Sequence, residues 1–288
     1  MKPSRSELVE INGLRIHVRR WGTPGAPRLF MLHGWMDCSA TFQFLVDELK
    51  GEWDIVAPDW RGFGLSQWQH GTYWFYDYFP DLACLIEHYS PNEPALILGH
   101  SMGANVAGSV AGLRPDSVRK FVSLDAYGNA LFRPDLEFER LHKWLHTRMR
   151  GPSPRRGYAS VEDFAERLRQ SNPRLPVDRA KFMAEHFSVR NDSGQIVPAA
   201  DPWHSVAAPL QPIEAFKSHW RRITAPVLWV IGEDSYLYAR FKEHQDEYRE
   251  RLDCFRRLHE VKLPDVGHNM QHEVPELLAP LVEDFLAD

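Results

Sequence analysis

The chain has 288 residues, of which 43% are hydrophobic and 25% charged, with a formal net charge of -5 and three cysteines. This composition is that of an ordinary globular protein, and it excludes a strongly basic nucleic-acid-binding protein and a disulfide scaffold. The N-terminal residues lack the apolar core of a secretion signal, and no apolar run approaches the roughly 18 residues that a transmembrane helix needs. We therefore expect a cytoplasmic protein whose partner is a small molecule, with no nucleic-acid or membrane partner.

The first part of the chain alternates short apolar segments with amphipathic ones, which is the pattern of a sheet flanked by helices. We expect strands at residues 14–20, 28–32, 54–57, 95–98 and 119–124, and helices at 40–50, 76–89 and 102–113. Strands and helices in this order predict an α/β fold with a doubly wound, mostly parallel sheet. Functional sites in such sheets lie at the carboxyl ends of the strands.

The pattern changes between residues 129 and 222. No convincing buried strand occurs there, and turns rich in proline and glycine separate amphipathic segments at 134–148, 160–170, 176–187 and 212–222. The sheet pattern then resumes, with strands at 226–232 and 257–263 and helices at 238–252 and 275–286. We therefore expect a core of residues 1–128 and 223–288, interrupted by a helical insertion at 129–222.

Two segments allow more than one interpretation. Residues 148–156 contain four arginines in a turn-rich stretch, which is either a solvated loop or a rim, formed by Arg155 and Arg156, that attracts anions to a site. Residues 68–79 contain seven aromatic side chains, which either anchor a helix on the sheet or line an apolar access route. In both cases the structural role is the simpler interpretation.

Residues 99–103 read Gly-His-Ser-Met-Gly and directly follow the expected strand at 95–98. In this G-x-S-x-G pattern the serine occupies a strained turn from strand to helix, so the residues two before and two after it must be nearly free of side chain. Because Ser101 stands at the start of a helix, the Met102 amide and the helix dipole point to where an oxyanion would form. The pattern indicates a serine nucleophile.

Three further motifs support this interpretation. Leu32-His33-Gly34-Trp35 is similar to an oxyanion loop, residues 57–66 to a D-x-R-G-x-G-x-S loop, and residues 266–275 to a G-H-x-x-x-x-E-x-P segment. Together with the Gly99–Gly103 turn, called the nucleophile elbow, these motifs make the chain resemble the α/β-hydrolase fold family over nearly its full length. The resemblance is strongest to serine esterases and serine-hydrolase-like proteins with a helical cap. The resemblance implies Ser101 as nucleophile, His268 as base, and the amides of Trp35 and Met102 as the oxyanion hole.

The acid of the triad has two candidates. Most members of the family carry it three residues after the glycine that ends a late strand, where this chain has Ser235, and Asp234 comes one residue early. Some esterases of the family instead take the acid from the strand after the elbow helix, where this chain has Asp125. We favour Asp125 and keep Asp234 as the alternative. We also prefer His268 to His272, which we expect to face solvent or to stabilise the loop.

The expected reaction is acyl transfer from an ester, or a related carbonyl compound, to water. His268 removes the proton of Ser101 as the serine attacks a small, apolar or aromatic substrate. No cofactor or metal is implied. The alternative is a cofactor-free dioxygenase of N-heteroaromatic substrates, which resembles this chain in its Gly-Trp oxyanion loop and in the position of Asp125. A non-catalytic binding module is a third possibility, and the substrate's identity and the oligomeric state stay open.

Overall fold

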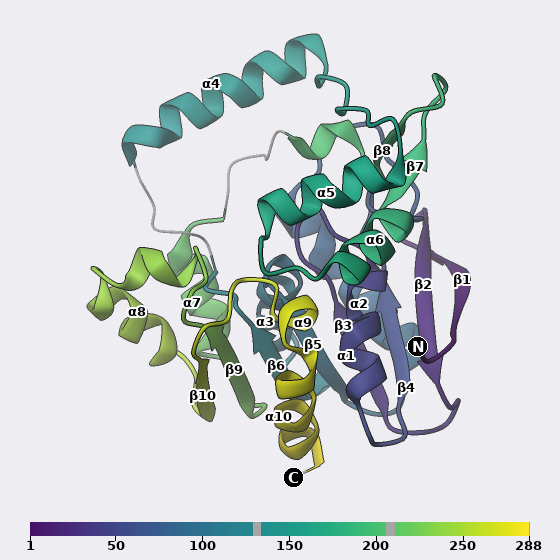
Figure 1. Ribbon diagram of the computed structural model, residues 1–288. Helices are drawn as coiled ribbons and strands as arrows, with labels where there is room; N and C mark the ends of the chain where they lie inside the picture. Colours follow the sequence, from purple (N-terminus) through teal and green to yellow (C-terminus); the bar gives the residue numbers. More distant parts are fainter. Residues whose placement is uncertain (129–133, 206–210, 288) are drawn as a thin grey trace.

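The computed structural model describes residues 1–128, 134–205 and 211–287 (Figure 1). Within these residues, eight strands form one sheet in the order β1-β2-β4-β3-β5-β6-β9-β10. The first two pairings, β1 with β2 and β2 with β4, are antiparallel, and all later ones are parallel. The predicted α/β fold with a mostly parallel sheet is confirmed. The strands of this sheet are β1 (Ser4–Ile11), β2 (Leu14–Gly22), β3 (Arg28–Leu32), β4 (Asp54–Pro58), β5 (Ala95–His100), β6 (Val118–Leu124), β9 (Val227–Gly232) and β10 (Leu258–Leu263).

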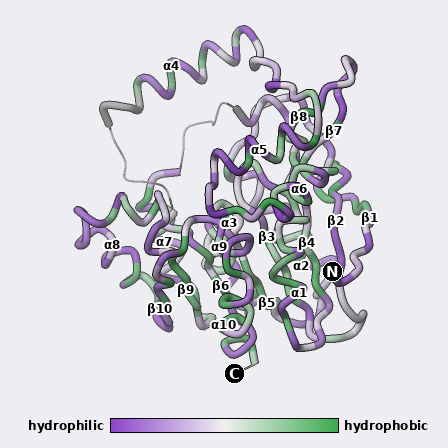
Figure 2. The backbone as a smooth tube through the Cα atoms, viewed as in Figure 1, coloured by the Kyte–Doolittle hydropathy of each residue, from purple (hydrophilic) through white to green (hydrophobic). Residues whose placement is uncertain are grey.

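Helices cover both faces of the sheet. Adjacent residues of β3 divide between two apolar clusters: Leu29 and Met31 pack on the side of α1 and α10, and Phe30 and Leu32 on the side of α2 and α3. Both faces of a central strand are therefore buried, which explains its continuous apolar sequence, and Figure 2 shows the central strands as largely hydrophobic. The α-helices are α1 (Gln43–Glu48), α2 (Tyr78–Tyr89), α3 (Met102–Leu113), α4 (Pro134–Arg150), α5 (Val161–Ser171), α6 (Val177–His186), α7 (Ile213–Trp220), α8 (Gln245–Leu252), α9 (Met270–Glu273) and α10 (Pro275–Ala287).

Three elements differ from those expected. β1 is an additional edge strand, joined to β2 by a tight turn in which Asn12 and Gly13 have φ values of 49° and 74°. An Asn-Gly pair between two strands is a signal for such a turn, but β1 is mostly exposed and so carries little apolar periodicity. The expected helix at 238–252 is divided into a 3-10 turn, Tyr238–Phe241, and α8. The short helix α9 was not expected.

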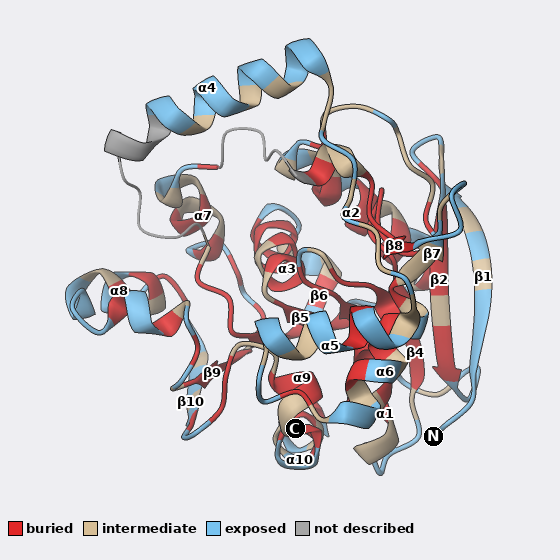
Figure 3. Cartoon of the chain, turned by 45° about the horizontal axis from the view of Figure 1, so that its top comes forward, coloured by how far each residue is buried: buried red, intermediate tan, exposed pale blue. Residues whose placement is uncertain are grey.

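The region 129–222 contains more than helices. A small two-stranded sheet, β7 (Ser188–Arg190) with β8 (Ile196–Pro198), lies among the described residues of this region, so the expectation of no buried strand is wrong. Ile196 and Val197 are buried, but strands of three residues are too short for periodicity to reveal. Helix α4 is largely exposed (Figure 3). The division of the chain into core and insertion stays a prediction, and residues 129–133, where the insertion was expected to begin, lie outside the described residues.

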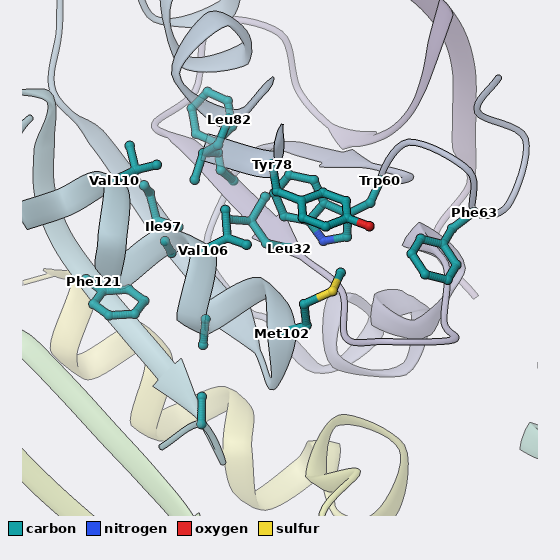
Figure 4. Close-up of a cluster of buried hydrophobic side chains, with 14 of the residues drawn as sticks. Leu32, Trp60, Phe63, Tyr78, Leu82, Ile97, Met102, Val106, Val110 and Phe121 are labelled. Carbon is teal, nitrogen blue, oxygen red and sulfur yellow. The ribbon is translucent and has the colours of Figure 1, made fainter. Parts of the chain in front are cut away.

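Helix α7 falls in the expected insertion but packs on the sheet. Its Phe216 and Trp220 side chains are buried, and the Trp220 ring meets the ring of Trp229 on β9 at 5.8 Å in an edge-to-face contact. Helices α4, α5 and α6 and the β7–β8 sheet lie beyond one end of the main sheet (Figure 1). The face of the sheet that α2 and α3 cover is filled by the side chains drawn in Figure 4, among them Leu32, Trp60, Tyr78 and Met102.

Candidate active site

Ser101 stands between β5 and α3 in a strained backbone conformation, with φ of 52° and ψ of -115°. Its amide donates to the carbonyl of Leu124 at 2.9 Å, which ties the turn to β6. A Cβ atom at Gly99 would lie 2.5 Å from the backbone of Ala104, and one at Gly103 would collide with the carbonyls of Leu32 and His33. Both glycines are therefore required by close backbone contacts. The strained backbone of Ser101, which is not a glycine, is typical of functional sites.

Three groups from distant parts of the chain form a continuous set of contacts. His268 Nε2 lies 3.1 Å from Ser101 Oγ, and His268 Nδ1 lies 2.5 Å from Asp125 Oδ2. Ser101 follows β5, Asp125 follows β6, and His268 lies in the loop between β10 and α9. The structure therefore brings together the predicted nucleophile, the predicted base and the favoured acid at the carboxyl ends of the strands.

Asp125 is fully buried, and its carboxylate accepts hydrogen bonds from three side chains. Besides His268, Tyr127 Oη donates to Oδ1 at 2.8 Å and Ser235 Oγ donates to Oδ2 at 2.5 Å. Burial, together with the nearby Asp125 charge, raises the pKa of Tyr127 well above its usual value, so this hydroxyl stays a donor. Ser235, the position at which the family resemblance places the acid, donates to Asp125 instead.

Asp234, the alternative acid, is not brought to His268. Its carboxylate pairs with the guanidinium of Arg174, and its side chain is 43% exposed. Because Asp234 precedes Ser235 in a sharp turn, its side chain points to the outside of the loop while that of Ser235 points inward to Asp125. The direction of the turn therefore decides that Asp125, and not Asp234, contacts His268.

The loop that carries His268 is held at several points. Glu273, whose side chain is 4% exposed, accepts from the amides of Gly267 at 2.7 Å and Asn269 at 3.3 Å. His100 Nε2 donates to the carbonyl of His268 at 2.9 Å, and Gln271 Nε2 donates to His100 Nδ1 at 3.2 Å. Burial lowers the pKa of His100 well below its usual value, so the ring stays neutral and can play both roles.

His272 is buried, contrary to one of the two expectations for it, and contributes to holding the loop. Its Nε2 contacts Thr41 Oγ1, and its carbonyl accepts from Arg179 at 2.6 Å. Burial, followed by the charge of Arg179, lowers the pKa of His272 to about 3, so the imidazole is neutral at physiological pH. It lies outside hydrogen-bond contact with Ser101, whose partner is His268.

The loop after β3 is packed directly against the elbow. A Cβ atom at Gly34 would lie 3.3 Å from Ser101 Cβ, so the backbone leading into Trp35 runs beside Ser101. His33 shapes this loop: Nδ1 donates to the Gly34 carbonyl at 2.8 Å, and Nε2 accepts from the Trp60 amide at 2.9 Å. Burial lowers the pKa of His33 to about 4 and keeps the ring neutral, as these two roles require.

The loop at 57–66 contacts the loop after β3 through Trp60 and His33 and is held by hydrogen bonds of its own. Asp59 accepts from His17 Nδ1 at 2.7 Å and from the amides of Ser39 at 2.6 Å and Leu65 at 2.9 Å. Burial alone would raise the pKa of Asp59, but the hydrogen bond and charge of His17 outweigh it and lower the pKa to about 2. Arg61 forms a bidentate pair with Asp81, with both N···O distances at 2.6 Å. These residues act as a scaffold.

A cavity of about 310 Å³ opens over Ser101 and His268. Its apolar wall comes from α5, α6 and the segments that follow them, through Leu168, Leu175, Met183 and Phe187. Trp35, Met36 and Tyr236 complete the apolar part, and the Tyr236 ring meets the His268 ring edge to face at 4.9 Å. Asp37, Asn172 and His272 contribute polar groups. The cavity lies where the strands end, as the fold predicts.

The two segments with open interpretations lie away from this cavity. None of the aromatic side chains of residues 68–79 is among the described residues that line it; Tyr73 and Tyr78 are buried, and Tyr78 packs edge to face on Trp60 at 5.5 Å. Arg155 donates to the carbonyls of Ala200 at 3.3 Å and Asp201 at 3.0 Å. Arg156 lies over the Tyr158 ring. Tyr73 and Tyr78 are therefore packing groups, and Arg155 links the segment to the backbone at residues 200 and 201.

Several lining residues escaped the sequence analysis. Asp37 follows Trp35 by two residues and could have been found by its position next to the Gly-Trp pair. Asn172, Leu175 and Tyr236 lie in connecting segments without any motif, so no local signal marks them. No group of three or more potential metal ligands occurs in residues 1–128, 134–205 and 211–287. Every helix in the described part of the chain is too short or too polar to cross a bilayer.

Comparison with known proteins identifies the class. The model of the alpha/beta hydrolase family matches residues 29–281, and the chain therefore belongs to this family. The chain is 29% identical to the 2-(acetamidomethylene)succinate hydrolase of Mesorhizobium japonicum, over 98% of this chain and 95% of the relative. It is 34% identical to a serine hydrolase-like protein of Danio rerio over 60% of this chain and 55% of that protein.

Solved structures have the same fold. A thioesterase domain from the curacin biosynthetic pathway superposes with a TM-score of 0.85 at 21% identity, covering 98% of this chain and 99% of that one. The structure of E-2-(acetamidomethylene)succinate hydrolase superposes with a TM-score of 0.77 at 27% identity, covering 99% of this chain and 100% of the other. Relatives of this chain are thus hydrolases, and the predicted family is confirmed.

Proposed function

We propose that the chain is a serine hydrolase that cleaves an ester, or a related carbonyl bond, through an acyl-enzyme. The observation that carries the proposal is the unbroken series of contacts from Ser101 Oγ to His268 and Asp125, opening on a cavity of about 310 Å³. A serine hydroxyl is a poor nucleophile at neutral pH unless a base takes its proton as it attacks. His268 Nε2 is placed to do so, and buried Asp125 orients the ring and stabilises the imidazolium that forms.

In the first half of the reaction, Ser101 Oγ attacks the substrate carbonyl and its proton passes to His268 Nε2. The amides of Trp35 and Met102 stabilise the resulting oxyanion, a contribution on the order of 10²–10³ in rate for each such donor. His268 then returns the proton to the leaving alcohol. In the second half a water molecule attacks the acyl-enzyme, with His268 again acting as base, and Ser101 is released. An ester is favoured over an amide because an alcohol leaves more easily than an amine.

Covalent labelling tests the proposal. A fluorescent fluorophosphonate should label the wild-type protein, and Ser101→Ala should abolish both the label and the hydrolysis of p-nitrophenyl esters. Ser109→Ala, which changes a buried serine on α3 that does not line the cavity, is the matched control and should retain the label. Folded wild-type protein that takes up no label would refute the proposal. Oxygen consumption with a hydroxyquinolone, in place of ester hydrolysis, would favour the dioxygenase alternative.

A substrate panel follows from the cavity and from the relatives. p-Nitrophenyl esters of increasing acyl length measure the usable depth of the pocket, since its wall is formed by apolar side chains of α5 and α6. The name of the Mesorhizobium japonicum relative adds 2-(acetamidomethylene)succinate as a compound to include. The proposal is supported if the wild-type protein hydrolyses any of these compounds and the Ser101→Ala variant does not.

A further inference from the structure

Helix α4 carries an apolar stripe that the described part of the chain leaves uncovered. Phe138, Leu141, Leu145 and Met149 recur at spacings of three and four residues, so they lie along one side of the helix. These residues are 71%, 39%, 50% and 73% exposed, and Figure 3 shows the helix as largely exposed. Single apolar side chains on a surface are ordinary, but a continuous row of large ones marks a surface that binds a partner.

Helix α4 contacts the rest of the chain through side chains outside the stripe. The Trp144 ring lies 6.1 Å from the ring of Trp74, and the Arg148 guanidinium lies over the Trp203 ring at 5.2 Å. Trp144 is half-buried, whereas its neighbour Leu145 is exposed. The helix lies beyond the same end of the sheet as α5 and α6, which line the cavity (Figure 1). A surface that binds the stripe would therefore meet the end of the molecule at which the cavity lies.

The segment that carries the stripe is strongly basic, although the chain as a whole is acidic. Residues 138–156 contain six lysines and arginines and one glutamate, a formal net charge of +5, whereas the whole chain has a net charge of -5. Lys143, Arg148 and Arg150 on α4 and Arg156 beyond it are exposed. A helix is about 10 Å across, close to the Debye length of about 8–10 Å at physiological salt. The charges therefore act on the surface that the stripe contacts, and that surface is expected to be anionic.

We propose that α4 docks on the surface of a bilayer that contains anionic phospholipids, with the stripe inserted among the headgroups. A helix with phenylalanine and leucine on one side and lysine and arginine on the others is typical of helices that lie in a membrane interface. The sequence contains no apolar run long enough to cross a bilayer, but a helix that lies in its surface needs apolar residues on one side only.

The charge of the segment also distinguishes between occupants of the stripe. Two copies of the chain that met through α4 would bring together two segments of net charge +5, which repel each other. An anionic bilayer attracts the same segment and repels the acidic remainder of the chain, so it orients the molecule with α4 toward the membrane. This docking is independent of the reaction at Ser101, so vesicle binding and covalent labelling are separate outcomes.

Co-sedimentation with lipid vesicles tests the docking without any turnover. We expect the protein to pellet with vesicles made of phosphatidylglycerol and phosphatidylcholine in equal parts. Binding to vesicles of phosphatidylcholine alone should be at least about tenfold weaker, and high salt should weaken binding to the mixed vesicles. No binding to the mixed vesicles, or equal binding to both kinds, would overturn the inference.

Two double variants separate the apolar contribution from the charged one. Phe138→Ser with Met149→Ser removes both ends of the stripe, and Lys143→Glu with Arg150→Glu reverses two exposed charges. Each should weaken binding to the mixed vesicles about tenfold or more. Gel filtration without lipid checks the other occupant: a wild-type dimer that the first variant dissociates would identify a second copy of the chain on the stripe and would contradict the proposal.

Matched substitutions elsewhere on the surface are the controls. Leu113→Ser with Leu277→Ser removes two leucines that are 53% and 54% exposed at the end of α3 and on α10. Lys242→Glu with Arg256→Glu reverses two exposed charges outside α4. Both control variants should bind the mixed vesicles as wild type does, and a loss equal to that of the α4 variants would refute the docking. Melting curves check that all four variants fold, as expected for substitutions of exposed side chains.

Discussion

The strand ends of the core and the helices α5 and α6 meet at the same cavity but contribute different groups to it. The core supplies Ser101, His268 and Asp125, each held by backbone hydrogen bonds or buried partners. The helices supply an apolar wall, and their polar contacts with the core lie at the rim, as between Asn172 and Glu273 at 3.1 Å. Under the proposed function, the reacting groups and the apolar wall therefore belong to parts of the molecule that can be altered separately.

The largest expected effect is at the buried acid in the core. Asp125→Asn should lower kcat for every ester by about 10⁴-fold, because the amide can no longer hold His268 in the required tautomer. Asp234→Asn removes an equal charge from an exposed carboxylate paired with Arg174 and should stay within about threefold of wild type. Steady-state kinetics of both variants, with melting curves to check folding, make the comparison. A large loss in Asp234→Asn and a small one in Asp125→Asn would reverse the assignment.

A substitution in the apolar wall of the cavity should change the preference for acyl length without changing the reaction at Ser101. Leu175→Trp replaces an aliphatic side chain of the cavity with a larger indole ring. It should lower kcat/KM for the longest p-nitrophenyl esters by about 10–100-fold and change that for the acetate ester by less than about threefold. Leu277→Trp, at an exposed position on α10, is the control. Fluorophosphonate labelling should proceed in both. An equal loss for short and long esters would mean that the wall and the reacting groups are coupled.

Asp37 should make stability depend on pH in an unusual direction. Burial raises the pKa of Asp37 from 3.8 to about 7, so the folded state binds a proton that the unfolded state has lost. The contribution of this group to stability is complete below pH 3.8 and is lost as the pH rises through 7. Asp37→Asn should therefore gain about 1–3 kcal/mol relative to wild type at alkaline pH, and little at acid pH. Urea unfolding at the two pH values measures this, and a gain equal at both would contradict it.

The smallest effects are expected in the arginine-rich segment. Arg155→Glu should cost about 1–3 kcal/mol of unfolding free energy, since it removes the donor to the carbonyls of Ala200 and Asp201. Arg156→Glu, at an exposed position, should stay within about 0.5 kcal/mol. Neither variant should change the ratio of rates for carboxylate-bearing and uncharged esters by more than about twofold. A selective loss of the carboxylate ester in Arg156→Glu would restore the anion-attracting rim as an explanation.

Local patterns predicted the fold well because the central strands and their helices carry their own signals. The runs at 29–32 and 95–98 are apolar throughout, as expected for strands buried on both faces. The edge strand β1 and the short strands β7 and β8 escaped detection, since exposure removes the apolar alternation in the first and three residues are too few to show it in the others. Helix α7 was expected as a helix, but its packing on the sheet depends on Phe216 and Trp220 finding partners far away in the chain.

By itself, the sequence determined where a serine stands between two glycines, where a histidine follows a late strand, and which loop precedes the elbow, because each of these is a motif within ten residues. It left the acid open between Asp125 and Asp234, and it gave no sign that His272 contacts the hydroxyl of Thr41. Those contacts join residues more than a hundred positions apart. Only the packing of β6 beside β9, and of the loop after β10 over the elbow, decides which side chains meet, since a carboxylate's direction depends on the backbone of its turn and on the donors that surround it.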